Sequence, residues 1–113
     1  MTSPNRPSAE VLDQLFAVIE SRKGADPATS YTAKLFDRGR GKIVQKMGEE
    51  SFECAVAALS EGPDALTAES ADLLYHLLVL WADAGLAPEA VWQELAGRFG
   101  ISGIVEKASR SQN

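Results

Sequence analysis

The stretch that decides the fold is EESFECAVAALSEGPDALTAESADLLYHLL, residues 49–78. At its centre, Glu61-Gly62-Pro63 is a stop-and-restart signal, because glycine commonly ends a helix and proline begins one. Two acidic pairs flank this signal: Glu50 with Glu53, and Glu69 with Asp72. The i,i+3 spacing places both carboxylates of a pair on one side of a helix. If the helices fold back antiparallel, the inner acids lie roughly 14 and 11 Å from the glycine and the outer acids roughly 18 and 15 Å, so all four are predicted to converge.

This convergence predicts a bound divalent cation. Four like charges in one patch repel each other unless a positive charge lies among them. Glu50 falls in the middle of an apolar stripe of its helix, and Glu69 falls on a similar stripe of the next helix. Ionised groups in a helix interface are costly unless they are paired, protonated or bound to metal. A set of solvated acids or ordinary salt bridges is the alternative interpretation.

The bulk composition limits the class of protein. The chain has 113 residues, enough for one domain and too few for two. A net charge of −5 argues against nucleic-acid binding, and a single cysteine rules out an internal disulfide and fits a reducing compartment. No export signal is expected at the N-terminus, and the most apolar run, residues 73–82, is about half the roughly 20 residues that span a bilayer. A cytoplasmic protein with no membrane partner is expected.

Helical periodicity predicts an all-α fold, a compact helical bundle in a single domain over residues 1–113. Its four main helices are expected at about 9–23, 42–60, 64–83 and 88–98, with a short helical piece at 31–37. Outside the bundle (residues 8–99), we expect a flexible leader at 1–7 and a tail at 100–113 with a last turn around 104–108. From Leu73 to Trp81 apolar side chains appear on nearly every side, so we expect a homodimer that buries this helix and Trp81 or Trp92.

A basic stretch leads into the first acidic helix. It holds five of the eleven basic residues: Lys34, Arg38, Arg40, Lys42 and Lys46. A polyphosphate held on a metal needs this arrangement, with the cation at the reacting phosphates and Lys or Arg on the flanking oxygens. We therefore expect Lys46 and Lys42 to bind substrate, with Lys34 and Tyr31 as further candidates. Taken alone, a solvated charged loop is the alternative, and the glycines nearby do not form a P-loop.

Two neighbours of the acids are expected to support them. His76 lies one turn after Asp72 and could hold an acid by a hydrogen bond, although a satisfied core histidine is an equally good interpretation. Glu49 points about 100° away from Glu50 on the helix, which favours a supporting or solvated group over a direct ligand. One histidine cannot supply the paired Glu-x-x-His motifs of a di-iron bundle.

The acidic signature, Glu50-x-x-Glu53 followed by Glu69-x-x-Asp72, resembles that of the MazG-type all-α nucleotide pyrophosphohydrolases. Three segments resemble the phosphoribosyl-ATP pyrophosphatase family within that superfamily: SYT at 30–32, KMGEE at 46–50 and ESADLLYHLL at 69–78. The tail at 102–104 and 106–110 is also similar to this family. The resemblance covers about residues 9–110, and the segment at 69–78 is its most specific part.

The resemblance implies Mg²⁺-dependent hydrolysis of the nucleotide phosphoribosyl-ATP to phosphoribosyl-AMP and pyrophosphate, the second step of histidine biosynthesis. It implies that the metal ligands and catalytic residues are Glu50, Glu53, Glu69 and Asp72, and all-oxygen ligands suit Mg²⁺. The mechanistic hypothesis is in-line attack by water on the α–β phosphoanhydride, with Lys46 and Lys42 steadying the leaving phosphates. A general house-cleaning nucleoside triphosphate pyrophosphohydrolase is the closest alternative. The second alternative is a non-catalytic helical dimer that serves as a binding module.

Overall fold

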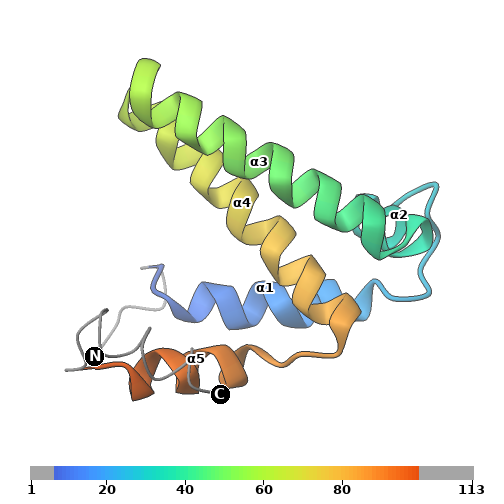
Figure 1. Cartoon of the computed structure of the whole chain (residues 1–113). Coiled ribbons are helices and arrows are strands. Elements are labelled where there is room, and N and C mark those ends of the chain that lie inside the picture. The colour runs from blue at the N-terminus through green and yellow to red at the C-terminus, as the bar shows by residue number, and fades with distance from the viewer. Residues whose placement is uncertain (1–6, 100–113) are drawn as a thin grey trace, which may run out of the picture.

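The computed structural model describes residues 7–99, and within this range every regular element is an α-helix (Figure 1). The helices are α1 (Glu10–Ser21), α2 (Tyr31–Arg38), α3 (Arg40–Ser60), α4 (Pro63–Ala84) and α5 (Pro88–Gly97). The predicted all-α class is confirmed, with the short piece at 31–37 forming a helix in its own right. The predicted leader before residue 7 and the predicted tail at 100–113 lie outside the described residues.

Caps and glycines set the helix boundaries. The Ser30 hydroxyl accepts a hydrogen bond from the Ala33 amide at 3.1 Å and so caps α2. Gly39 has a φ of 94°, a conformation that favours glycine, and it alone separates α2 from α3. The sequence predicted a longer break there, so α3 begins earlier than expected. Gly62, with a φ of 117°, precedes Pro63 at the start of α4, as the stop-and-restart signal predicts.

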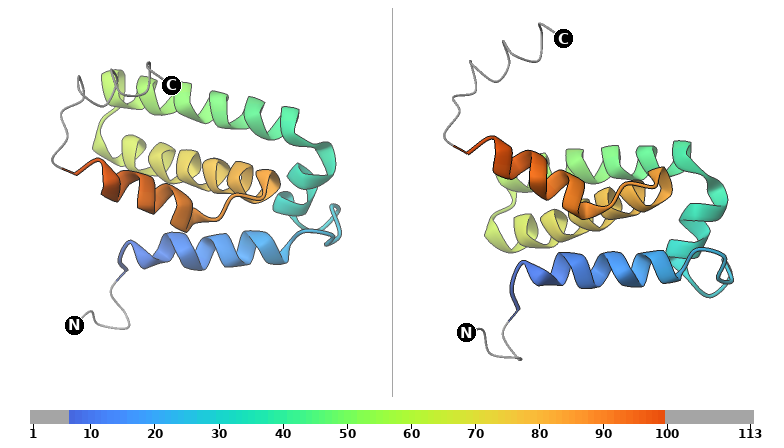
Figure 2. Two further views of the ribbon diagram at one scale, coloured as in Figure 1. Left: turned by 60° about the horizontal axis from the view of Figure 1, so that its bottom comes forward. Right: turned by 90° about the horizontal axis from the view of Figure 1, so that it is seen from below.

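Helices α3 and α4 form a long antiparallel hairpin, and the other helices gather at one end of it (Figures 1 and 2). We call residues 40–47 and 74–84 the hairpin base and residues 51–68 the hairpin tip. Helix α2 packs against α3, and α1 packs against α4. The chain then returns through α5 to lie beside α1, where the Trp92 indole N–H donates to the Asp13 carboxylate at 3.3 Å.

The buried core lies at the hairpin base. Its members are fully or almost fully buried and come from four helices: Ile19, Leu35, Ile43, Leu78, Val79 and Ala82. Trp81, predicted to lie in a dimer interface, packs edge-on against Trp92 within the chain at 5.8 Å between ring centroids. Among residues 7–99, no helix is both long enough and apolar enough to cross a membrane.

Candidate metal and phosphate site

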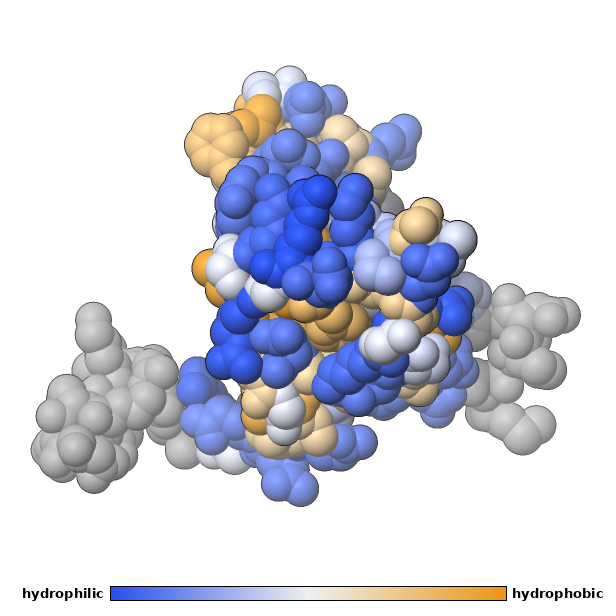
Figure 3. All heavy atoms as spheres, turned by 90° about the vertical axis from the view of Figure 1, so that its right-hand side faces the viewer, coloured by the Kyte–Doolittle hydropathy of each residue, from blue (hydrophilic) through white to orange (hydrophobic). Residues whose placement is uncertain are grey.

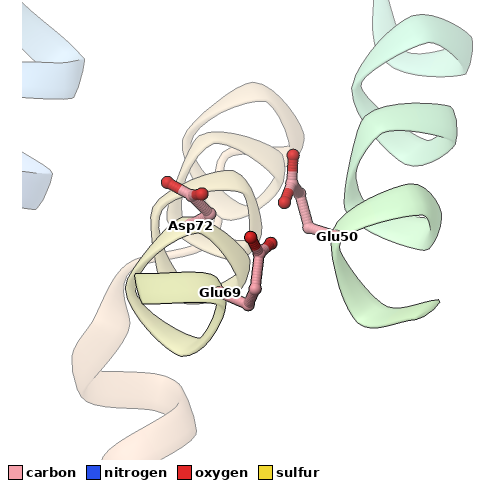
Figure 4. A group of neighbouring side chains, drawn as sticks. All are labelled: Glu50, Glu69 and Asp72. Atoms are coloured by element: carbon pink, nitrogen blue, oxygen red, sulfur yellow. The ribbon is translucent and has the colours of Figure 1, made fainter. Parts of the chain in front are cut away.

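Three carboxylates meet between the base and the tip of the hairpin. Glu50 comes from α3, and Glu69 and Asp72 come from successive turns of α4. Each contributes one oxygen to a group whose members all lie within 4.8 Å of one another. Figure 4 shows Glu50 reaching from its helix toward the two acids of α4. The antiparallel register predicted from the glycine therefore brings these three acids together.

The donor set fits a hard divalent cation. The Oε2 atoms of Glu50 and Glu69 are buried and have no hydrogen-bond partner in the described part of the chain. Buried carboxylate oxygens without partners are costly, so protonation or a bound cation would stabilise this group. All-oxygen ligands with one open side suit Mg²⁺, which keeps water and substrate oxygens in its shell. Asp72 is exposed, so the group is accessible to solvent at this residue.

The electrostatics of Glu69 agree with this interpretation. The pKa of Glu69 is raised from 4.5 to about 7, first by burial, then by hydrogen bonding and charge from Glu53, and last by the charges of Glu50 and Asp72. In the absence of metal, this carboxyl group therefore holds a proton near neutral pH. A cation among the same oxygens replaces that proton, so metal binding is linked to proton release.

Glu53, the fourth predicted ligand, differs from the other three. It is exposed and does not belong to the group of three carboxylates. Its influence on the pKa of Glu69 places it close to that side chain. The structure thus assembles three of the four predicted acids directly and leaves Glu53 as their neighbour.

The predicted substrate-binding residues line a single pocket of about 160 Å³. Its walls are Tyr31, Lys34, Leu35, Arg38, Lys42 and Lys46. Seen from the α2 end of the molecule, hydrophilic side chains cover much of this face (Figure 3). Four of the six lining residues carry a positive charge, which makes this a pocket for anionic groups. Arg38 was part of the basic stretch but not among the predicted site residues.

Lys46 links the basic pocket to the acids. It lies one turn before Glu50 on α3 and pairs with Glu49 at 3.2 Å. The Glu49 carboxylate, which also accepts a hydrogen bond from Gln45 at 3.0 Å, raises the pKa of Lys46, and smaller contributions come from Tyr31 and Glu50. Glu49 therefore lies outside the carboxylate group and pairs with a basic side chain of the pocket, whereas the sequence predicted support for the acids.

His76 is buried and bonds to two partners in the site. Its Nδ1 lies 2.8 Å from the backbone carbonyl oxygen of Asp72, and its Nε2 lies 3.1 Å from the Tyr31 hydroxyl. The predicted hydrogen bond to an acid is thus made to the backbone of that acid. The contact with Tyr31 joins residues 45 positions apart, and no sequence spacing could have indicated it.

Comparisons with known proteins bear on the family of this chain. Residues 12–99 match the family described as phosphoribosyl-ATP pyrophosphohydrolase. A phosphoribosyl-ATP pyrophosphatase of Rhodospirillum rubrum is 69% identical over 106 residues, covering 94% of this chain and 91% of that protein. Proteins of the same name from Paramagnetospirillum magneticum and Azospirillum brasilense are 65% and 62% identical, covering 92% and 91% of this chain and 95% and 93% of their own lengths.

Proposed function

Because this chain belongs to the phosphoribosyl-ATP pyrophosphohydrolase family and is a hydrolase of the pyrophosphatase type, we propose that it acts in histidine biosynthesis on phosphoribosyl-ATP. Water cleaves the α–β phosphoanhydride, and the products are phosphoribosyl-AMP and pyrophosphate. The observation that carries the proposal is the adjacency of an acidic group, Glu50 with Glu69 and Asp72, to a pocket lined by four cations. A polyphosphate substrate needs both halves of this arrangement.

The three grouped acids would hold Mg²⁺, with Glu53 as a further ligand candidate. The bound ion supplies a charge that polarises the reacting phosphate and lowers the pKa of a bound water. Lys42 and Lys46 bind the β and γ phosphates and neutralise the charge on the departing pyrophosphate. Lys34 and Arg38 line the same pocket and add to its positive charge. Exposed Asp72 leaves the reacting phosphate accessible to water.

The proposal includes a homodimer. Phe52, Val56 and Leu59 recur at helical spacing on α3 and are 70%, 38% and 88% exposed. An apolar stripe of this size on a helix is commonly covered by a partner. A second copy of the chain is the simplest cover, and light scattering is expected to give twice the mass of the chain. A monomer mass at micromolar concentration would contradict this part of the proposal.

The same proposal places the enzyme in the cytoplasm. Its proposed substrate is a nucleotide made inside the cell, and the half-buried Cys54 is a free thiol, as expected in a reducing compartment. Fractionation of cells that express the chain at its native level is expected to recover it with cytoplasmic enzymes.

Pyrophosphate release from phosphoribosyl-ATP, with and without Mg²⁺, tests the activity. We expect release that depends on Mg²⁺, and much slower release from dUTP, dCTP and ATP. Expression of the chain in a histidine auxotroph that lacks this step is expected to restore growth. Faster hydrolysis of dUTP or dCTP than of phosphoribosyl-ATP would instead indicate a house-cleaning hydrolase. No release from any nucleotide would indicate a binding module.

A further inference from the structure

The hydrogen bonds of His76 fix the direction of its bond to Tyr31. A backbone carbonyl oxygen can only accept, so His76 Nδ1, at 2.8 Å from the Asp72 carbonyl, carries the proton. In a neutral imidazole the other nitrogen then has a lone pair and no proton. The Tyr31 hydroxyl, at 3.1 Å from Nε2, therefore donates its only proton to His76.

This bond determines what Tyr31 offers to the basic pocket. With its proton given to His76, the phenol oxygen can only accept a hydrogen bond on its pocket side. Phosphate oxygens are acceptors as well, so this oxygen is a poor direct partner for a phosphate. The other polar groups that line the pocket are all cationic donors: Lys34, Arg38, Lys42 and Lys46. Tyr31 is thus an acceptor placed among donors.

Lys46 is the donor whose surroundings include Tyr31. The two side chains line the same pocket, and Tyr31 lies close enough to make a Coulombic contribution to the raised pKa of Lys46, after the larger effects of Glu49. Glu49, an exposed residue of α3, holds the ammonium at 3.2 Å. When Lys46 leaves Glu49 to bind an anion, the Tyr31 oxygen is an acceptor within the pocket that can keep the ammonium there.

We propose that His76 and Tyr31 are positioning residues that act on substrate through Lys46: His76 holds the Tyr31 hydroxyl as an acceptor, and Tyr31 directs the Lys46 ammonium toward the phosphates. This inference rests on the proposed function for the identity of the anion, a polyphosphate. It assigns a role to His76, the single histidine of the chain. This ring bonds to Tyr31 in the basic pocket and to the backbone of Asp72 in the carboxylate group, so it connects the two parts of the site. Neither positioning residue needs to contact the phosphates.

A double-mutant cycle tests the inference, because two residues that act in one chain have non-additive effects. The probe is inorganic pyrophosphate with Mg²⁺, whose Kd is measured by calorimetry and needs no turnover. Tyr31→Phe is expected to raise this Kd about 5- to 10-fold, the size of one typical hydrogen bond. In a Lys46→Met background, the same change is expected to alter the Kd less than about 2-fold.

Two variants at His76 separate its two bonds. His76→Asn keeps a donor near the Asp72 carbonyl but is too short to reach Tyr31, so it should raise the Kd as Tyr31→Phe does. His76→Gln extends an amide toward Tyr31 and can again accept its proton, so it should restore most of the affinity. If His76→Asn does not fold, the cycle between Tyr31→Phe and Lys46→Met decides alone, because Tyr31 is half exposed and the change removes one oxygen.

Tyr75→Phe is the matched control. Tyr75 stacks on Tyr31 at 6.2 Å between ring centroids and its hydroxyl bonds to Thr32, but it does not line the pocket. Loss of the Tyr75 hydroxyl should lower the melting temperature without changing the Kd for pyrophosphate. A merely structural role of Tyr31 and His76 would produce that same pattern at those positions and would overturn the inference.

Two further results would contradict the inference. If Tyr31→Phe weakens pyrophosphate binding as much with Met at position 46 as with Lys, then Tyr31 binds the anion itself and the inference is wrong. An unchanged or lower Kd in His76→Asn would equally contradict it. The proposed function fails on a different result, the absence of pyrophosphate release from phosphoribosyl-ATP by the unaltered enzyme, so the two failures are distinguishable.

Discussion

The two ends of the α3–α4 hairpin are built from similar residues but differ in what covers them. At the base, Ile43, Leu78 and Val79 are at most 1% exposed, because α1 and α2 pack over them. At the tip, Phe52 and Leu59 are 70% and 88% exposed, and α3 and α4 have only each other as described partners. The acidic site lies between the two ends.

This difference indicates that the base of the hairpin stabilises the fold and that the tip is left as an exposed surface. Apolar burial is the main source of folding free energy, and here it is concentrated at the base. A group of partly buried acids opposes folding, and a rigid neighbouring core can hold it in place. The tip contributes little to the stability of one chain, and its exposed apolar stripe is available to a partner. The predictions below test this division, from the largest expected effect to the smallest.

Neutralising one acid between the two ends should abolish activity without unfolding the protein. Glu50→Gln and Asp72→Asn each remove a charged ligand from the group of three and are expected to lower turnover about 100-fold or more. The helical circular dichroism should stay unchanged, because neither side chain belongs to the core at the base. Glu61→Gln, at an exposed acid beyond the end of α3, is the control and should keep full turnover. Near-normal turnover in both site variants would refute the assignment.

Truncating one leucine at each end should lower the free energy of unfolding much more at the base than at the tip. Leu78→Ala is expected to lower the free energy of unfolding by about 2–5 kcal/mol, because the side chain is 1% exposed and leaves a cavity. Leu59→Ala, at 88% exposure, should change it by less than about 0.5 kcal/mol within one chain. Chemical denaturation measures both values at a protein concentration low enough for the chain to be monomeric, so that the proposed dimer interface does not contribute. Equal losses would show that the tip is as well packed as the base.

The melting temperature of the metal-free protein, measured over a pH series, should report the titration of Glu69. The pKa of Glu69 is raised from 4.5 to about 7 in the folded protein, chiefly by burial and then by Glu53, so folding favours the protonated form. The stabilisation is full below pH 4.5 and is lost as the pH rises toward about 7. With a chelator present, the melting temperature should therefore fall across this range. Glu69→Gln should flatten the profile, and an unchanged slope in that variant would assign the effect elsewhere.

The sequence predicted most of the fold because its signals are local. The glycine and proline between residues 61 and 64 set the hairpin turn, and the number of residues from that turn to each acid predicts which acids lie at the same height. Glu50 was found because an acid on an apolar stripe breaks a clear pattern. The basic residues were found because they lie close together in the chain.

The contacts that the sequence could not predict join distant segments. The bond between Tyr31 and His76 depends on how α2 turns at Gly39 and packs near α4, and no spacing encodes that angle. Glu53 was predicted as a fourth ligand from its helical spacing and from the family resemblance. Its exposure depends on the orientation of the α3 side chains toward α4, which periodicity gives only coarsely. The division between a covered base and an open tip likewise needed the placement of α1 and α2.

A calorimetric titration with Mg²⁺, performed near pH 6.5 on the unaltered enzyme and on Asp72→Asn, tests most directly whether the acids between the two ends hold a metal. The account predicts saturable binding by the unaltered enzyme, with proton release that varies with the ionisation heat of the buffer. It predicts that binding is lost or greatly weakened in Asp72→Asn and retained in Glu61→Gln. Equal Mg²⁺ affinity in all three proteins, or no binding by the unaltered enzyme even with pyrophosphate present, would contradict it.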